Sequence, residues 1–188
     1  MKHRQRLRRT AILCCHALRN IAFYKAGWDR GDLIAKDEFW VNINGNFIDT
    51  AITEWCKLFG DKRGHHYWRT IIRDKTLFLE KLLLEIDLNE EEFNKYIVEL
   101  KDYRDKFIAH LDSKDIMNIP KLRTAKDSVS FLYDYLLKNE EQDDCFHDAP
   151  ENASRYYIKC YSTGRDVYLK NSLIGFIEIT SESGGKTL

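Results

Sequence analysis

The sequence predicts an all-α protein, a bundle of helices in a single domain. Apolar residues recur at helical spacing along most of the chain. Proline and glycine are scarce, and the two prolines, Pro120 and Pro150, stand where helices can begin. A chain of 188 residues, 44% of them hydrophobic, is long enough for one domain with a core and too short for two. We expect that domain to span residues 1–180, with short irregular elements toward its C-terminal end, and residues 181–188 to form a disordered tail.

The N-terminal part of the chain predicts two helices separated by a break. Helical spacing of apolar residues places the first helix over residues 5–24 and the second over residues 37–59. Between them, residues 27–31 interrupt the pattern with two glycines. Gly45 weakens the second helix without ending it, whereas Gly60 is a typical helix stop.

The middle of the chain predicts a polar loop followed by two helices. Residues 61–70 have the composition of a loop or short turn, and a helix over residues 75–85 follows. The next helix begins after Leu88, where Asn89 is a good N-cap and three glutamates occupy the first turn, as the helix dipole favours. This helix is expected to end near Leu111.

The C-terminal part of the chain predicts one clear helix and several shorter elements. The clear helix spans residues 120–139, and an acidic break over residues 139–149 follows it. Residues 150–173 predict one or two short helices, which Gly164 would separate. Residues 174–180 alternate weakly in polarity and predict a short strand.

The formal net charge is zero, but the charges are unevenly distributed. Thirty Lys and Arg residues balance thirty Asp and Glu residues, which excludes a polyelectrolyte that binds nucleic acid over its whole surface. Residues 1–28 carry seven Lys or Arg residues and no acid, whereas residues 139–151 carry six acids. The basic segment predicts either a phosphate-binding patch or a solvated basic helix, and the sequence leaves both open.

The cysteines and histidines form no metal-binding pattern. The five cysteines match no zinc spacing, and the neighbours Cys14 and Cys15 would point about 100° apart on a helix. The adjacent His65 and His66 do not make a metal site by themselves. We expect no metal, no cofactor, and buried thiols of the kind found in a reducing cytosol.

The sequence also predicts where the protein is located. No apolar run reaches transmembrane length, so we expect no membrane contact and a cytoplasmic location. The N-terminal segment has no clear secretory cleavage site. Its arginines and its lack of acids would also suit an organelle transit peptide.

Arg104 and His110 are the main candidate functional residues. Their helix carries apolar residues at positions 93, 97, 100, 107, 108 and 111. At about 100° per residue, Arg104 falls inside this apolar stripe, where a charged guanidinium is costly unless something pairs with it. His110 lies at the edge of the stripe, so the helix presents a fixed cation and a titratable imidazole together.

The run Arg-Asp-Lys-Phe-Ile-Ala-His-Leu-Asp at residues 104–112 resembles the HEPN superfamily of helical ribonucleases and nucleotide-binding modules. That family carries an Arg, four to six variable residues and a His, usually with a polar residue directly after the Arg, here Asp105. The Ala-His-x-Asp ending is similar to the abortive-infection branch. The resemblance spans residues 1–140 and implies a HEPN-like helical bundle.

The resemblance implies a metal-independent endoribonuclease that acts as a toxin or antiphage effector. His110 would serve as general acid or base, Arg104 would hold the phosphate under attack by the 2′-hydroxyl, and Asp105 would orient either group. Six residues along an α-helix leave Arg and His about 120° apart. In the family a homodimer relieves this, because two such helices face each other in one cleft. RNA and an antitoxin protein are the further partners implied.

Four other residues are candidates for binding the RNA substrate. Tyr103 and Lys106 lie beside the motif, on the edge of its helix. Arg69 and Arg73 lie close in sequence to Trp68, and together these side chains could stack on and clamp RNA. Such residues also commonly cap the edge of a core.

Other interpretations of the motif stay open. Arg104 would also suit a structural ion pair with a buried carboxylate, and His110 would be favourable near a helix C-terminus for the dipole alone. The chain would then be a non-catalytic HEPN module that binds a nucleotide or a protein partner. A helical interaction protein outside the family is the third interpretation.

Overall fold

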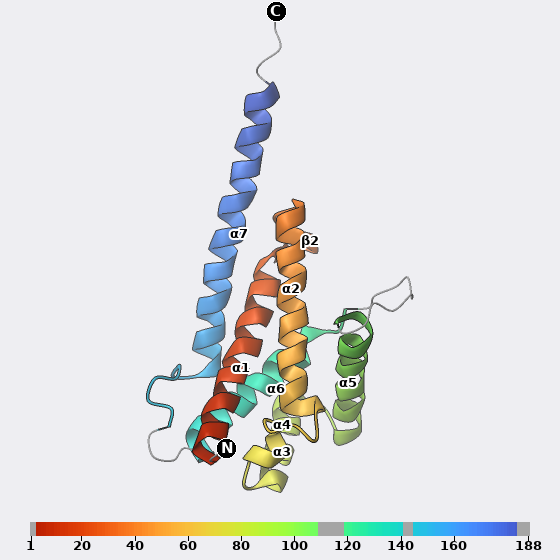
Figure 1. Ribbon diagram of the computed structural model, residues 1–188, viewed down its shortest axis with the longest axis vertical. Helices are drawn as coiled ribbons and strands as arrows, with labels where there is room; N and C mark the ends of the chain where they lie inside the picture. The colour runs from red at the N-terminus through yellow and green to blue at the C-terminus, as the bar shows by residue number, and fades with distance from the viewer. Residues whose placement is uncertain (1–2, 109–118, 141–144, 184–188) are drawn as a thin grey trace, which may run out of the picture.

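The computed structural model describes residues 3–108, 119–140 and 145–183, and this part of the chain is mostly helical (Figure 1). The helices are α1 (His3–Ala26), α2 (Glu38–Trp55), α3 (Trp68–Ile71), α4 (Lys75–Ile86), α5 (Glu90–Tyr103), α6 (Leu122–Tyr135) and α7 (Ala153–Ser183). The predicted all-α class is therefore confirmed. The five helices predicted between residues 5 and 139 all occur, and most of their ends differ from the prediction by a few residues. The end predicted near Leu111 lies outside the described residues.

Helix α1 lies at the centre of the bundle, between α2, α6 and α7 (Figure 1). Its buried face repeats at helical spacing, which is why the sequence pattern located it. Leu18 of α1, Trp55 of α2 and Leu132 of α6 are fully buried and belong to one continuous core. The Trp55 indole donates a hydrogen bond of 2.9 Å to the Ser128 hydroxyl on α6, so the one polar atom of this large side chain is satisfied inside the core.

Three helices end in a wider π-helical turn rather than stopping abruptly. These turns are η1 (Cys56–Gly60) after α2, η2 (Arg104–Ile108) after α5 and η3 (Leu136–Glu140) after α6. A π-turn uses i→i+5 hydrogen bonds and often marks a functional position. The candidate residue Arg104 is the first residue of η2.

Two short segments differ from the expected loops. The break at residues 27–31 is a small antiparallel hairpin, β1 (Trp28–Asp29) and β2 (Asp32–Leu33). At its turn, Arg30 has φ 49° and Gly31 has φ 94°, a left-handed conformation that glycine adopts without strain. The segment expected to be a loop at residues 61–70 contains the single-turn helix α3.

The C-terminal prediction was wrong, because one continuous helix, α7, replaces the short helices and the strand expected over residues 150–180. Gly164 does not separate two helices. A Cβ at Gly164 would lie 2.9 Å from Cδ1 of Phe23, so this glycine instead lets α7 lie close to α1. Helix α7 continues to Ser183, inside the expected tail, and residues 184–188 lie outside the described residues.

Candidate functional site

Helix α5 positions the candidate site at its C-terminal end. The helix starts at a capping box, in which the Asn89 side chain accepts from the Glu92 backbone N–H and the Glu92 carboxylate accepts from the Asn89 N–H. Phe93 and Leu100 are buried in the core and fix the orientation of the helix. The turn that carries Arg104 is thus held at a defined place on the surface of the bundle.

The Arg104 guanidinium is held between two carboxylates. Its Nε donates to Oδ1 of Asp105 over 2.8 Å, and its Nη1 donates to Oδ1 of Asp61 over 2.8 Å. The Arg104 side chain keeps 20% of its surface exposed. The sequence predicted that a charge at this position needs a partner, but it did not identify Asp61, which follows the π-turn at the end of α2.

The two carboxylates also set the protonation behaviour around Arg104. Partial burial by itself lowers the pKa of Arg104, but the hydrogen bonds to Asp105 and Asp61 outweigh this and raise the pKa above its ordinary value. The guanidinium is therefore a permanent cation. The nearby Cys56 thiol stays protonated, because burial raises its pKa to about 12 even though the Arg104 charge opposes the rise. Arg104 can bind an anion, whereas Cys56 is unsuited to act as a nucleophile at neutral pH.

His110 lies outside the described residues, which end at Ile108 on this side of the gap. Arg104 and Asp105 are therefore the members of the predicted triad that the structure brings together. The π-turn η2 also changes the geometry of the motif, because the angle of about 100° per residue applies to an α-helix only. The expected separation of about 120° between Arg104 and His110 does not transfer to this turn.

Tyr103 and Lys106, predicted to contact substrate, make local contacts of different kinds. The Tyr103 side chain is buried, and its hydroxyl donates to Oδ1 of Asp49 over 3.3 Å. Burial raises the pKa of Asp49, and the Tyr103 hydrogen bond only partly offsets this rise. Lys106 is 3.1 Å from Asp102 on the outer face of the turn, with 43% of its side chain exposed, and it remains accessible to a ligand.

Arg69 and Arg73 lie on the other side of the predicted loop, around α3. The Arg69 guanidinium stacks over the buried Trp68 ring, with its Cζ 4.5 Å from the ring centroid. Arg73 binds the buried Glu140 carboxylate, through Nε at 3.0 Å from Oε2 and through its backbone N–H at 3.0 Å from Oε1. The Nε contact has the distance of an ion pair but not the geometry of a hydrogen bond to Oε2. Among the described residues, no hydrogen bond or ion pair joins these two arginines to Arg104.

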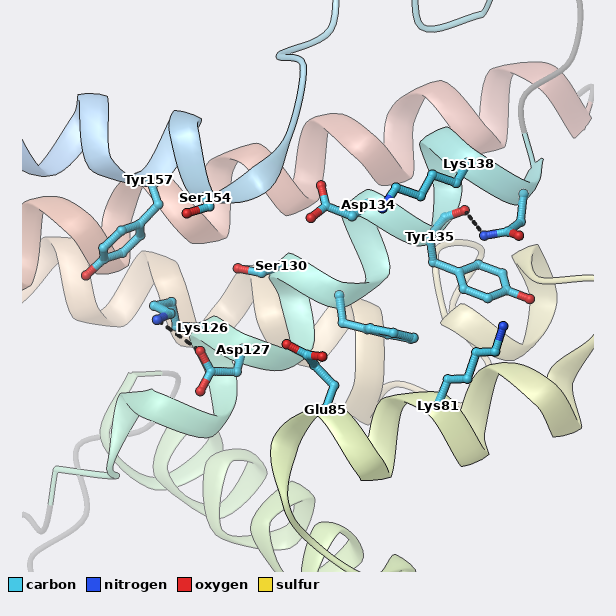
Figure 2. A pocket seen from close by; sticks show the side chains of 12 residues that line it. Lys81, Glu85, Lys126, Asp127, Ser130, Asp134, Tyr135, Lys138, Ser154 and Tyr157 are labelled. Carbon is cyan, nitrogen blue, oxygen red and sulfur yellow. Dashed lines mark hydrogen bonds and ion pairs between the residues drawn. The ribbon is translucent and has the colours of Figure 1, made fainter.

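A separate cavity lies between α4, α6 and α7 (Figure 2). It has a volume of about 490 Å³ and presents three lysines and three acids. Lys126 contacts both an acid and an aromatic ring, since its Nζ is 3.0 Å from Oδ1 of Asp127 and 5.5 Å from the centroid of the Tyr157 ring. Because cations and anions alternate along this groove, it has no preference for a phosphate.

The described residues give no indication of a metal centre. None of them forms a group of three or more His, Cys, Asp or Glu side chains that could hold an ion. All five cysteines are free thiols, and burial raises the pKa of Cys14, Cys15 and Cys160 as well as that of Cys56. No helix in the described ranges has the length and hydropathy that a membrane span requires.

The arrangement at η2 thus presents a guanidinium that two carboxylates hold in a fixed orientation. The sequence did not predict that Asp61 is part of the site. The one indication of it in the sequence is that an acid directly follows the predicted helix stop Gly60. The chain matches no protein-family model, no curated protein and no solved structure.

Proposed function

We propose that this protein is a metal-independent endoribonuclease of the HEPN type, acting as a cytoplasmic toxin or antiphage effector, with Arg104, Asp105 and His110 as its catalytic residues. The observation that carries the proposal is the state of Arg104. Its guanidinium is permanently charged, partly exposed, and oriented by two carboxylates at a π-turn. Its Nη2 group makes no hydrogen bond to another described residue, which leaves donors for a ligand.

The proposed reaction transfers the phosphate within the RNA strand. His110 accepts the proton of the 2′-hydroxyl, the 2′-oxygen forms a bond to phosphorus, and the bond from phosphorus to the 5′-oxygen breaks. A second general acid, or His110 after it has been protonated, supplies the proton that the 5′-oxygen needs. Arg104 stabilises the extra negative charge on the phosphorus-bound oxygens. The products are a 2′,3′-cyclic phosphate and a 5′-hydroxyl.

The phosphate must compete with a carboxylate for Arg104. Two carboxylates beside one guanidinium give this cluster a net negative charge, which repels RNA. Asp105 is 55% exposed, compared with 36% for Asp61, so it is the carboxylate that can turn away into water at lower cost. In this proposal Asp61 holds the guanidinium in place while the phosphate takes the position of Asp105.

The proposal includes a homodimer, in which two η2 turns face each other and form one cleft for RNA. The support is indirect: Arg104 and His110 are six residues apart and need not share a face within one chain. Lys106 and Arg69 are the remaining proposed contacts to the RNA backbone, because both are accessible. The contacts of Tyr103 with Asp49 and of Arg73 with Glu140 favour supporting roles for these two residues.

A second function, a non-catalytic HEPN module, is favoured by one specific observation. The Arg104 charge is already paired twice, as expected for a structural arginine that joins the end of α5 to the loop after η1. Such a module would bind a nucleotide or a protein partner and would not cleave RNA.

Incubation of the purified protein with single-stranded RNA in the presence of EDTA distinguishes the two functions. The ribonuclease should produce 2′,3′-cyclic phosphate ends, and His110→Ala should reduce the rate about 10²-fold or more. His147→Ala, at an exposed histidine outside the motif, is the matched control and should retain activity. Absence of cleavage by a dimeric wild-type protein would favour the non-catalytic module.

A further inference from the structure

Four basic side chains surround a cavity that lies apart from the contacts of Arg104. Arg6 and Arg9 of α1, with His65 and His66 of the loop before α3, line a cavity of about 440 Å³. None of the described residues that line it is acidic. Figure 1 shows the N-terminal end of α1 beside α3, where these two segments come together.

The local structure explains why these side chains gather. Arg6 and Arg9 are three residues apart and lie on the same face of α1. The loop turns twice, with the Gly64 N–H donating to the Asp61 carbonyl over 2.7 Å and the Tyr67 N–H donating to the Gly64 carbonyl over 3.3 Å. These turns bring His66 against α1, where its Nδ1 lies 3.5 Å from the hydroxyl of the buried Thr10.

One donor in this cluster lacks an acceptor. The Nε of Arg6 is buried and makes no hydrogen bond within the described part of the chain. A buried donor on a charged group is costly when it is left unpaired, so such groups normally have a partner. Since the described residues of the cavity wall supply no acid, an anion bound from solution would be a suitable acceptor.

The charges that face His66 lead to the same conclusion. Burial lowers the pKa of His66, and the positive charges of Arg9 on α1, His65 on the loop and Lys57 on η1 lower it further. Glu54 on α2 opposes this effect, but its carboxylate is 3.1 Å from the Lys57 ammonium. The cations of Arg9, His65 and Lys57 thus repel a protonated His66, and an anion placed beside His66 would reduce this repulsion.

We propose that Arg6, Arg9, His65 and His66 form a binding site for a phosphate group. Arginine provides the planar pair of donors that fits phosphate oxygens, and the two imidazoles add further N–H donors. This site stands independently of the ribonuclease proposal, because none of its four residues belongs to the motif at Arg104. Asp61 and His66 are five residues apart, so their Cα atoms are separated by at most about 20 Å. This limits the distance between the phosphate site and the Asp61–Arg104 contact. A phosphate of a bound RNA strand and a free phosphate ligand are the two sources of such a group.

Binding of sulfate and of pyrophosphate to the whole protein tests the site. Sulfate mimics phosphate and keeps the same charge between pH 5.5 and 8. We expect saturable binding that raises the melting temperature and shifts the ring C–H signals of His65 and His66. Arg6→Gln and His66→Gln should each weaken binding about tenfold or more. Arg4→Gln, at an exposed arginine on the same helix that does not line the cavity, should bind like the wild type.

Three results would overturn the site. One is the absence of binding up to tens of millimolar anion (an order-of-magnitude limit for a weak site). Another is equal loss of binding in Arg4→Gln and Arg6→Gln, which would indicate a diffuse basic helix. The third concerns pH. Burial and the neighbouring cations lower the pKa of His66, so affinity for sulfate should fall as the pH rises through this lowered pKa. This fall should disappear in the double variant His65→Gln, His66→Gln. Persistence of the same fall in the double variant would contradict the assignment.

A competition experiment between sulfate and RNA identifies the source of the phosphate. If it belongs to RNA, sulfate should compete with a single-stranded RNA oligonucleotide, and Arg6→Gln should weaken RNA binding to a similar degree. If RNA binding is unchanged while pyrophosphate binding is lost, the site takes a free phosphate ligand. Both results support the site itself. A catalytically inactive protein that still binds sulfate would refute the ribonuclease proposal alone.

Discussion

The Arg104 guanidinium donates a hydrogen bond of 2.8 Å to the Asp61 carboxylate, across 43 residues of sequence. This contact joins the π-turn after α5 to the loop after η1, and both segments lie at the ends of helices that the core holds in place. A cation fixed in this way is suited to hold a phosphate, but the negative charge of the same carboxylate also repels that phosphate. The balance between these two effects of Asp61 can be measured.

Asp61→Asn should increase the affinity for RNA. The substitution keeps the shape of the side chain but removes one of the two negative charges beside Arg104, so repulsion of the phosphate decreases. We expect affinity at low salt to increase roughly threefold or more and the difference to shrink as salt is added. Asp102→Asn, at an exposed carboxylate paired with Lys106, is the control for general charge. An equal increase in both variants would show that Arg104 is not where RNA binds.

Two glycines within helices should respond in opposite ways to substitution by alanine. Gly164→Ala would place a Cβ 2.9 Å from Phe23 and 3.1 Å from Cβ of Ala26, so it should destabilise the fold by about 1–3 kcal/mol. Gly45→Ala meets no atom within 4 Å and should stabilise α2 by about 0.5–1 kcal/mol. Urea unfolding of the two variants checks this. Stabilisation by Gly164→Ala would show that α7 does not pack closely on α1.

The sequence predicted correctly those helices that bury one side in the core. Helices α1, α2, α4, α5 and α6 each bury an apolar face, and the sequence located all five. Helix α7 was missed because its aromatic and polar residues show little periodicity and a glycine interrupts them. The reason for that glycine is the close approach of α1, which only the three-dimensional arrangement reveals.

The sequence predicted that Arg104 needs a counter-ion, but it did not identify every partner. A charged residue in an apolar stripe indicated that Arg104 needs a counter-ion, and Asp105 was identifiable because it is adjacent. Asp61 and Glu140 were not identifiable, since nothing in a single sequence shows which loop approaches which helix end. Likewise, the basic segment at the N-terminus gave no sign that Arg6 and Arg9 would meet His65 and His66.

Asp49→Asn should stabilise the protein at neutral pH and have little effect in acid. Burial raises the pKa of Asp49 above its ordinary value of 3.8, so its neutral form is favoured by folding and its ionised form is disfavoured. The contribution of protonated Asp49 to the stability of the folded state is complete below pH 3.8 and is lost as the pH rises through the pKa of the folded state. Asparagine has no such cost and still accepts the Tyr103 hydrogen bond.

The expected gain is below about 1 kcal/mol at pH 7, because water partly screens this half-buried carboxylate. Melting temperatures of the wild type and Asp49→Asn between pH 4 and 7 provide the measurement. The difference between them should narrow as the pH falls. A melting temperature of Asp49→Asn below that of the wild type at pH 7 would mean that the ionised carboxylate stabilises the fold, in conflict with its burial beside Tyr103.

Arg73→Ala should destabilise the fold, because it leaves the buried Glu140 carboxylate with the backbone N–H of residue 73 as its remaining partner. The expected loss is about 1–3 kcal/mol. Arg123→Ala, at an arginine that is 87% exposed in its pair with Asp127, should change stability by about 0.5 kcal/mol or less. Adding Glu140→Gln to Arg73→Ala should recover part of the loss. Equal stability of Arg73→Ala and wild type would show that the ion pair contributes nothing.

The most direct test of the ribonuclease proposal is the rate of RNA cleavage by Arg104→Lys, measured together with its melting temperature. Lysine keeps the charge but lacks the planar pair of donors that holds a phosphate, so cleavage should fall about 10²-fold or more while the melting temperature stays within a few degrees of wild type. Arg123→Lys should leave both quantities unchanged. A large fall in melting temperature, with unchanged cleavage per folded molecule, would contradict the proposal and make Arg104 a purely structural residue.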